Sequence, residues 1–375
     1  MKKLLFVPVL LLLLVALTPV MAQDAATLPA LDELATGEWN RIVPGGDTIC
    51  ARGGEYSFFV RPGESDDLMI YFQGGGACWN GVNCEEGFRF PPDAEGPLFK
   101  EAVAENESDS YNQGVFDFEN ADNPFADYSV VYVPYCTADV HTGDAQVEFE
   151  GQNGSYTINF NGVNNARSAL NWAYENFTEP SSLFIAGGSA GAYGSIYHAA
   201  DIITNYEGVP ATQLGDAGVG VTPRAWEGLA TWGLYDNLPD YVEELADITP
   251  ERYSIRLHYA ATARAFPENQ FGMYTTWTDG VQIGFFLLQG GGASPQEAGA
   301  NWVATSRSIM SGLQGSLNNF AGFTSGGSAH TILDTPDFYT YEVGDLRFRD
   351  WVADLLASEA SNILCIDCAN ADVGE

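Results

Sequence analysis

The sequence predicts an α/β protein with a mostly parallel central sheet and helices on both faces. Three observations favour this class. Short runs rich in β-branched and aromatic residues alternate with segments of helical periodicity. Two of these runs end abruptly in glycines, and functional groups of a parallel sheet gather at such carboxyl ends. The 375 residues are 46% hydrophobic and 13% aromatic, enough for a large packed core.

The elements can be placed from these patterns. Strand-like runs cover residues 67–72, 128–135, 182–186 and 271–278. Helical periodicity covers residues 167–176 and 192–202. Thr249-Pro250 and Ser294-Pro295 are typical of helix starts, with an N-cap hydroxyl followed by proline at the first helical position. We therefore expect one helix over residues 250–265 and another from Pro295 onward.

Residues 1–22 are typical of a secretory signal peptide. A basic start precedes an almost unbroken apolar run from Leu4 to Val20, and small or permissive residues precede Gln23. An uncleaved membrane anchor is the alternative, although the run is slightly short for a span. The expected organisation is a signal peptide (1–22), an acidic leader (23–45), one large domain (46–360) and a C-terminal tail with a cysteine pair (361–375). We expect the mature protein to be extracellular or periplasmic.

The charge excludes several classes of partner. Fifteen basic residues face 50 acidic ones, for a net charge of −35. Removing Lys2 and Lys3 with the signal peptide takes the 15 basic residues to 13, so the net charge becomes −37 and Lys100 is the single lysine. Such a surface repels phosphate backbones and anionic lipids, so we expect no nucleic acid and no membrane partner. It suits an exported protein adapted to salt.

Six cysteines predict three disulfides in an exported chain, because disulfides persist in oxidising compartments. The cysteines are Cys50, Cys78, Cys84, Cys136, Cys365 and Cys368. Six cysteines allow 15 pairings, so the count alone leaves the connectivity open. Zinc is the alternative for Cys365 and Cys368, but a second pair at metal-ligand spacing is missing.

The strongest sign of chemistry is the G-x-S-x-G pattern at residues 187–191, centred on Ser189. It follows an apolar strand-like run and leads into a helical segment, which is the context of a nucleophile elbow. Small neighbours allow a tight turn that exposes the Ser189 hydroxyl, and helix N–H groups beyond it can stabilise an oxyanion. A glycine-rich turn without catalysis is the alternative.

A serine nucleophile needs a base, and the chain has four histidines. His198 follows Ser189 on the same predicted helix and His258 lies in another, so both are expected to pack. His141 follows a strand end, where it can line a pocket. In α/β-hydrolases the chain order is Ser, acid, His, and only His330 leaves ample room for an intervening acid. We therefore predict His330 as the base.

The acid stays open between two candidates at this point. Asp279 follows the run 271–278, and Asp216 follows a short strand-like turn. Chain geometry favours Asp279 only modestly. Its task would be to hold the tautomer of His330 and to stabilise the imidazolium that forms.

A glycine-rich loop follows the first strand-like run. Gly74-Gly75-Gly76 resembles the oxyanion loop of many esterases, with a flexible turn as the alternative. Together the glycine loop, the elbow and a late histidine are more specific than any one of them.

Five sequence blocks resemble the pectin acetylesterase and Notum family of secreted carboxylesterases. The blocks are FQGGGACW (72–79), VPYCTADVHTG (133–143), AGGSAGA (186–192), DGVQI (279–283) and AH (329–330). They span most of the chain, from about Cys50 to the region of Trp351. The first two are the most specific, because the glycine loop, the cysteine spacing and the P-Y-C motif occur together.

The resemblance implies an α/β-hydrolase fold and a set of roles. The implied triad is Ser189, His330 and Asp279, which places Asp279 above Asp216. The implied oxyanion hole consists of the N–H groups of Gly75, Gly76 and Ala190. The implied disulfides are Cys50–Cys136 and Cys78–Cys84, with Cys365–Cys368 as a local pair.

Two positions depart from the family pattern. Many members have an acidic residue where this chain has Gln73, and a tryptophan where it has Ala77. Trp79 instead follows the cysteine. We expect Trp79 and His141 to line the pocket, and we expect the departure to change the acyl or alcohol site.

The expected reaction is ester hydrolysis through an acyl-enzyme, with no metal or organic cofactor. The leading substrates are short acyl esters, acetyl foremost, on a polysaccharide. Polygalacturonate is itself a polyanion, so the acidic surface favours neutral acylated sugars or small esters. The alternatives are a lipid or polyester esterase with the same triad, and a non-catalytic secreted binding protein on a hydrolase scaffold.

Overall fold

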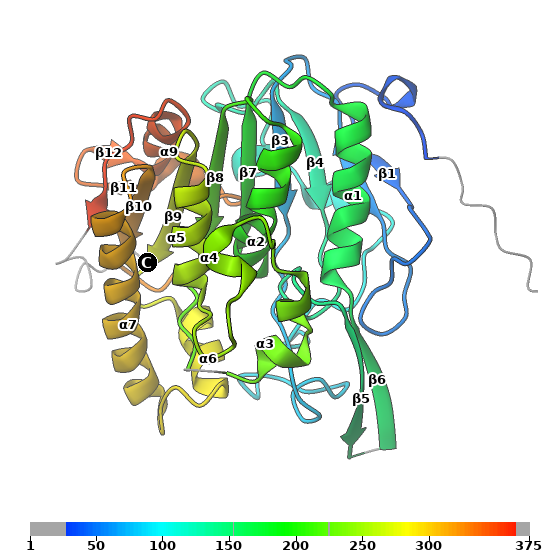
Figure 1. Ribbon diagram of the computed structural model, residues 1–375, viewed down its shortest axis with the longest axis vertical. Coiled ribbons are helices and arrows are strands. Elements are labelled where there is room, and N and C mark those ends of the chain that lie inside the picture. The colour runs from blue at the N-terminus through cyan, green and yellow to red at the C-terminus, as the bar shows by residue number, and fades with distance from the viewer. Residues whose placement is uncertain (1–27, 153, 224–225, 365–375) are drawn as a thin grey trace, which may run out of the picture.

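A computed structural model describes residues 28–152, 154–223 and 226–364 (Figure 1). The predicted signal peptide and the pair Cys365–Cys368 lie outside these residues. Within them a nine-stranded sheet has the order β1-β2-β4-β3-β7-β8-β9-β10-β13. β2 is antiparallel to both of its neighbours, and every pairing from β4 to β13 is parallel. The predicted mostly parallel sheet is confirmed.

The strands of this sheet are β1 (Asn40–Ile42), β2 (Phe58–Arg61), β3 (Leu68–Phe72), β4 (Ser129–Val133), β7 (Leu183–Gly188), β8 (Ala211–Asp216), β9 (Gln270–Thr276), β10 (Phe320–Ser325) and β13 (Ile363–Leu364). Two hairpins stand apart from it, β5 (Ala145–Gly151) with β6 (Gly154–Phe160) and β11 (Glu342–Val343) with β12 (Leu346–Arg347). Figure 1 shows β5 and β6 projecting from the body of the protein.

The helices are α1 (Gly162–Asn176), α2 (Ala190–Asn205), α3 (Gly228–Thr231), α4 (Glu243–Ala246), α5 (Ile255–Ala265), α6 (Gly280–Leu288), α7 (Pro295–Ser316), α8 (Asp337–Thr340) and α9 (Phe348–Leu356). Short 3-10 turns are η1 (Leu31–Glu33), η2 (Glu107–Ser110), η3 (Gly114–Phe116) and η4 (Leu234–Asn237). None of the helices in the described residues is long and apolar enough to cross a bilayer.

Helices cover both faces of the sheet. A side chain built at Gly215 of β8 would meet Tyr259 of α5, whereas one built at Gly272 of β9 would meet Leu355 of α9. Gly215 pairs with Met273, the residue after Gly272, and neighbouring residues of a strand point to opposite faces. In Figure 1 helices α1, α2 and α5 lie in front of the strands. β3, β7 and β8 are buried along their whole lengths, as expected for strands covered on both sides.

Two helix-start predictions had different outcomes. Ser294 caps α7, where its hydroxyl accepts a hydrogen bond from the N–H of Glu297 at 3.2 Å. The start at Thr249-Pro250 is wrong, because this signal closes only one turn in which the carbonyl of Thr249 accepts from the N–H of Arg252. α5 begins five residues later, where Ser254 caps the N–H of Leu257. α5 therefore begins directly after Ser254, whose side chain caps the helix next to its apolar residues, and not at Thr249-Pro250.

The sheet extends past both predicted domain boundaries. β1 falls within residues 23–45, the predicted acidic leader, and pairs with β2. β13 falls within residues 361–375, the predicted tail, and pairs with β10. These short edge strands lack the long apolar runs that mark the central strands, so hydropathy alone did not reveal them.

Candidate active site

Ser189 occupies a strained turn between β7 and α2. Its backbone has φ +56° and ψ −121°, in a region that non-glycine residues rarely adopt. The turn packs tightly against the end of β3, since a Cβ at Gly191 would lie 1.8 Å from the carbonyl oxygen of Phe72. The carbonyl of Asp216 accepts the Ser189 N–H at 2.7 Å. The G-x-S-x-G pattern therefore forms the predicted strand–turn–helix geometry.

The loop Gly74–Gly76 lies directly against this turn. A Cβ at Gly74 would stand 3.0 Å from the Cβ of Ser189. Gly76 has φ +75°, and a Cβ there would lie 2.0 Å from the carbonyl oxygen of Leu98. These close approaches explain why the chain uses glycines after β3. Within the described residues, no acceptor takes a hydrogen bond from the N–H of Gly75, Gly76 or Ala190.

Asp279 follows β9 and caps α6 with a buried carboxylate. Its Oδ1 accepts the N–H groups of Val281 and Gln282 at 3.0 and 2.9 Å. Its Oδ2 accepts the side-chain amide of Gln282 and the Nδ1 of His330, both at 2.8 Å. The carboxylate is fully buried, whereas the His330 side chain is 21% exposed. Nδ1 must carry the proton in this pair, because a carboxylate only accepts.

Hydrogen bonds between residues 276–278 and the segment just before His330 hold His330 next to this carboxylate. The carbonyl of Gly327 accepts the N–H of Thr278 at 3.2 Å and its hydroxyl at 2.6 Å. The hydroxyl of Thr276 donates to the carbonyl of Ala329 at 2.7 Å. The Nε2 of His330 is buried and has no partner among the described residues. This nitrogen keeps its lone pair free, as a general base requires.

Ser189 and His330 line the same two cavities, but no hydrogen bond joins the Ser189 hydroxyl to Nε2 in the described structure. Catalytic hydrogen bonds of this kind often tighten only with substrate in place. The structure therefore pairs His330 with Asp279 and places Ser189 and His330 in the lining of the same two cavities.

Asp216, the other candidate for the acid, forms no hydrogen bond with His330 among the described residues. Its Oδ2 accepts the N–H groups of Ile332 and Leu333, both at 2.8 Å. Burial raises the pKa of the Asp216 carboxyl well above its usual range, although the two N–H groups oppose this shift. The carboxyl thus holds the segment just after His330 rather than the imidazole.

A narrow apolar cavity opens on one side of Ser189. Its free volume is about 80 Å³. Large side chains dominate its lining, namely Trp79, Tyr193, Val221, Trp226, Leu229, Trp232, Leu234, Ile255, Phe285, Phe286 and Trp302. Trp79 contacts Trp226 edge to face at 4.9 Å between ring centroids. The structure therefore places Trp79 in the lining, where the sequence predicted it.

A second, wider cavity of about 650 Å³ also borders Ser189. Polar groups are frequent in its lining, which includes Gln73, Lys100, Ser110, Tyr111, Gln113, Tyr132, Thr331 and Asp334. The sequence did not single out Lys100 or Asp334 as site residues, because nothing local marks them. Lys100 is distinguished only by its being the single lysine beyond residue 3.

His141 does not line either cavity, contrary to the prediction. It is 1% exposed, and its Nε2 lies 2.8 Å from the carbonyl oxygen of Gln73. Burial lowers the pKa of His141 to about 3, so the ring is neutral and must donate from Nε2 to that carbonyl. Its backbone is in the left-handed region (φ +65°), which turns the ring inward beneath the glycine loop.

The other two histidines pack as predicted. His198 stacks on Phe72 and contacts the carbonyl of His141 at 2.9 Å through Nε2. His258 is fully buried in α5, with its Nδ1 3.2 Å from the hydroxyl of Tyr253. Within the described residues no group of three or more His, Cys, Asp or Glu side chains could hold a metal ion.

The sequence of residues 43–271 matches the family model described as Pectinacetylesterase. The chain belongs to the pectinacetylesterase family. The resemblance predicted from the sequence is thereby confirmed. The match includes the glycine loop and the Ser189 turn, and it ends before Asp279 and His330. No curated protein matches this chain.

Solved structures of the Wnt deacylase Notum from Drosophila share the fold. Its crystal form II is 15% identical with a TM-score of 0.63, and crystal form I is 14% identical with a TM-score of 0.61. Each alignment covers 89% of this chain, and they cover 97% and 98% of the Notum chains. This likeness establishes the predicted α/β-hydrolase fold. Membership in the pectinacetylesterase family makes the protein a carboxylesterase-type hydrolase.

Two predicted disulfides are confirmed. Cys50 pairs with Cys136 and Cys78 pairs with Cys84, and the described residues contain no free cysteine. Both bonds lie near the glycine loop, since Cys78 follows it and Cys136 follows β4. These disulfides and the family are consistent with a secreted protein.

Proposed function

We propose that this pectinacetylesterase-family protein is a secreted serine carboxylesterase that removes short acyl groups, acetyl foremost, from hydroxyl groups of neutral saccharides. One observation carries the proposal. Ser189 and His330 stand at the junction of a narrow apolar cavity and a wider polar one. An ester has one small apolar part and, in a saccharide, one large hydroxylated part, so the two cavities fit its two halves.

In the proposed reaction His330 Nε2 takes the proton of the Ser189 hydroxyl, and the oxygen of Ser189 attacks the ester carbonyl. The N–H groups of Gly75, Gly76 and Ala190 hold the resulting oxyanion, because they have no other acceptor among the described residues. Asp279 holds the tautomer of His330 and stabilises its imidazolium.

Collapse of the intermediate breaks the ester C–O bond, and His330 returns its proton to the leaving alcohol in the wide cavity. Water then attacks the acyl-enzyme with the same general base, which releases the acid and restores Ser189. The chain's own groups supply every proton transfer.

The size of the apolar cavity supports a short acyl group. A volume of about 80 Å³ lined by four tryptophans and two phenylalanines favours acetyl over a long fatty chain. A lipid esterase would need this space to be larger. The proposal therefore predicts that kcat/KM falls steeply from acetyl through butyryl to octanoyl esters.

The test compares nitrophenyl acetate, butyrate and octanoate with wild type, Ser189→Ala and Ser181→Ala. Ser181 is exposed near the opposite end of β7, so its substitution controls for the loss of a hydroxyl. We expect Ser189→Ala to lower kcat/KM by a factor on the order of 10⁶ and to abolish fluorophosphonate labelling. Retained activity or label in Ser189→Ala would rule out the nucleophile, and a preference for octanoate would favour the lipid esterase.

The charge of the polymer gives a second test. With 50 acidic residues against 15 basic ones, the protein repels polyanions most strongly at low salt. We expect acetylated neutral polysaccharide to be hydrolysed at all salt concentrations, and acetylated polygalacturonate only as salt rises. Equal rates on both polymers at low salt would contradict the neutral-saccharide assignment.

A further inference from the structure

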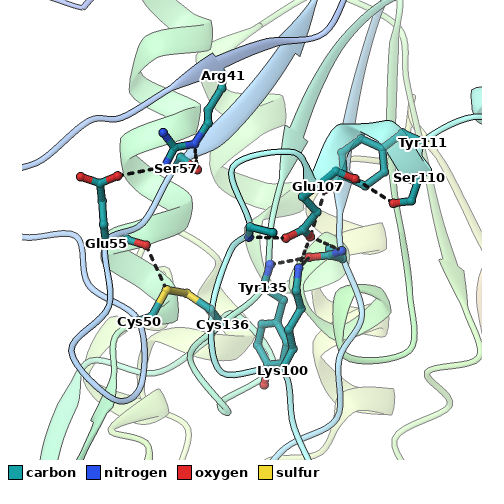
Figure 2. Close-up of polar contacts among 12 residues, drawn as sticks. Arg41, Cys50, Glu55, Ser57, Lys100, Glu107, Ser110, Tyr111, Tyr135 and Cys136 are labelled. Carbon is teal, nitrogen blue, oxygen red and sulfur yellow. Dashed lines mark hydrogen bonds and ion pairs between the residues drawn. A yellow bond between two sulfur atoms is a disulfide. The ribbon is translucent and has the colours of Figure 1, made fainter. Parts of the chain in front are cut away.

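A partly buried polar cluster lies against the glycine loop, and the catalytic roles proposed above do not use it. Its members are Gln73, Lys100, Glu107, Tyr111 and Tyr135, most of which Figure 2 labels. The Lys100 and Glu107 side chains are only 27% and 8% exposed. Lys100 is the single lysine beyond residue 3 in a strongly acidic chain, and its ammonium is bonded within this cluster.

Gln73, the residue between β3 and the glycines, is held at several points. Its N–H donates to the carbonyl of Val133 at 3.0 Å. Its side-chain oxygen accepts the N–H of Tyr135 at 3.0 Å and the ammonium of Lys100 at 2.7 Å. Its side-chain amide donates to Oε1 of Glu107 at 2.7 Å. The start of the loop is therefore fixed by two main-chain groups and two side chains that are distant in sequence.

Lys100 contacts both the loop and the residue that precedes it. Besides its bond to Gln73, its main-chain N–H donates to the carbonyl of Gly75 at 2.8 Å. That bond orients the Gly75–Gly76 peptide, because the carbonyl of Gly75 and the N–H of Gly76 belong to the same planar unit. Fixing the carbonyl toward Lys100 directs the Gly76 N–H the opposite way.

Glu107 completes the support. Its Oε1 accepts from Lys100, from Gln73 and from the hydroxyl of Tyr111, and its Oε2 accepts the N–H of Ala104 at 3.0 Å. Such a carboxylate is satisfied by donors and paired with a cation, which a buried charge needs. Burial lowers the pKa of the Lys100 ammonium, and the Glu107 charge opposes that shift.

We propose that Lys100 is a positioning residue that acts with Glu107 through Gln73 to hold the Gly74–Gly76 loop in the geometry that binds the oxyanion. The inference rests on the proposed function. It predicts that Lys100 contributes chiefly to kcat, because the loop acts when charge develops on the substrate oxygen. Lys100 also lines the wide cavity, but its ammonium already has two partners in the cluster.

The test is the double variant Lys100→Met/Glu107→Gln. It removes both charges together, so no uncompensated buried carboxylate remains to unfold the protein. The glutamine keeps an oxygen for the Gln73 amide and the Tyr111 hydroxyl. The matched control is Arg52→Met/Glu101→Gln, which removes the adjoining half-buried ion pair without touching Gln73.

Each variant is assayed on nitrophenyl acetate for kcat and KM separately, for fluorophosphonate labelling rate and for melting temperature. We expect the Lys100 double variant to keep its fold and KM within about threefold while kcat and labelling fall by roughly 10²-fold, the effect of one disturbed oxyanion donor. Lys100→Arg should recover part of the rate, because it keeps a donor to Gln73.

A folded double variant with the kcat of wild type would overturn the proposal, and so would an equal loss in the Arg52 control. Either result leaves the proposed esterase intact, since wild type would still hydrolyse the ester through Ser189. An inactive wild type would instead defeat the proposed function itself.

Discussion

Asp216 ends β8, Asp279 follows the neighbouring parallel strand β9, and both side chains are fully buried. Four donors face the oxygens of Asp279, one of them the imidazole of His330. Only two face Asp216, both on Oδ2, while its Oδ1 has no partner among the described residues. The two carboxyls thus hold different groups. Asp279 holds the imidazole of His330, and Asp216 holds the main chain just after it.

The proposed triad thus involves two kinds of acid contact. Asp279 sets the orientation of the ring, and Asp216 sets the position of the chain that carries the ring.

The largest effect is expected for Asp279→Asn. Asparagine still caps α6, but its amide cannot hold the same tautomer of His330, so kcat on nitrophenyl acetate should fall by about 10⁴-fold with little change in melting temperature. Asp216→Asn is the matched variant on the neighbouring strand and should keep most of the activity. Equal losses in the two variants would erase the distinction between the acids.

Asp216→Ala should instead act first on stability. It leaves the buried N–H groups of Ile332 and Leu333 without an acceptor, which we expect to cost on the order of 3 kcal/mol of unfolding free energy in urea titrations. Asp216→Asn retains an oxygen and should lose much less. If alanine and asparagine were equally stable, the carboxyl would not hold the segment after His330.

The pH dependence of the unfolding free energy should distinguish the wild-type protein from the Asp216→Asn variant. Because the folded-state pKa of Asp216 is raised above the unfolded value near 4, the folded protein keeps a proton that the unfolded chain loses. Its contribution to the unfolding free energy is full below about pH 4 and declines by about 1.4 kcal/mol per pH unit above it. Asp216→Asn lacks this slope and should gain relative stability as pH rises.

Urea titrations of both proteins from pH 4 to 7 measure that difference. Other buried groups whose pKa is shifted, such as His141, titrate alike in the two proteins and cancel. A stability difference that does not change with pH would show that the Asp216 carboxyl is already ionised in the folded state.

Much of this arrangement could be predicted from the sequence, because the relevant signals are local. The elbow around Ser189 needs glycines where the chain approaches β3, and Ser294 and Pro295 mark the start of α7 within a few residues. Family resemblance then supplied the disulfide pairs, which no count of cysteines determines.

The missing parts depend on contacts between distant segments. Nothing near Asp216 shows that its carboxyl meets residues 332 and 333, and nothing near Lys100 shows that it meets Gln73. His141 failed as a pocket residue for the same reason, because its inward rotation follows from a positive φ and a contact with the Gln73 carbonyl.

The smallest effect is expected at Gln282, which bonds to Asp279 and not to Asp216 among the described residues. Its side-chain amide donates to the Asp279 oxygen that also meets His330, and its oxygen accepts the N–H of Val219 at 3.0 Å. Gln282→Leu should lower kcat on nitrophenyl acetate by roughly tenfold, the value of one hydrogen bond to a charged group, about 1.5 kcal/mol.

Gln289→Leu is the matched control, because Gln289 lines the same apolar cavity without a bond to Asp279. It should change KM more than kcat. If the two leucine variants had the same kcat, the carboxylate of Asp279 would hold His330 without help from Gln282. Its strength as an orienting group would then come from the two main-chain N–H donors at the start of α6, which no side-chain substitution removes.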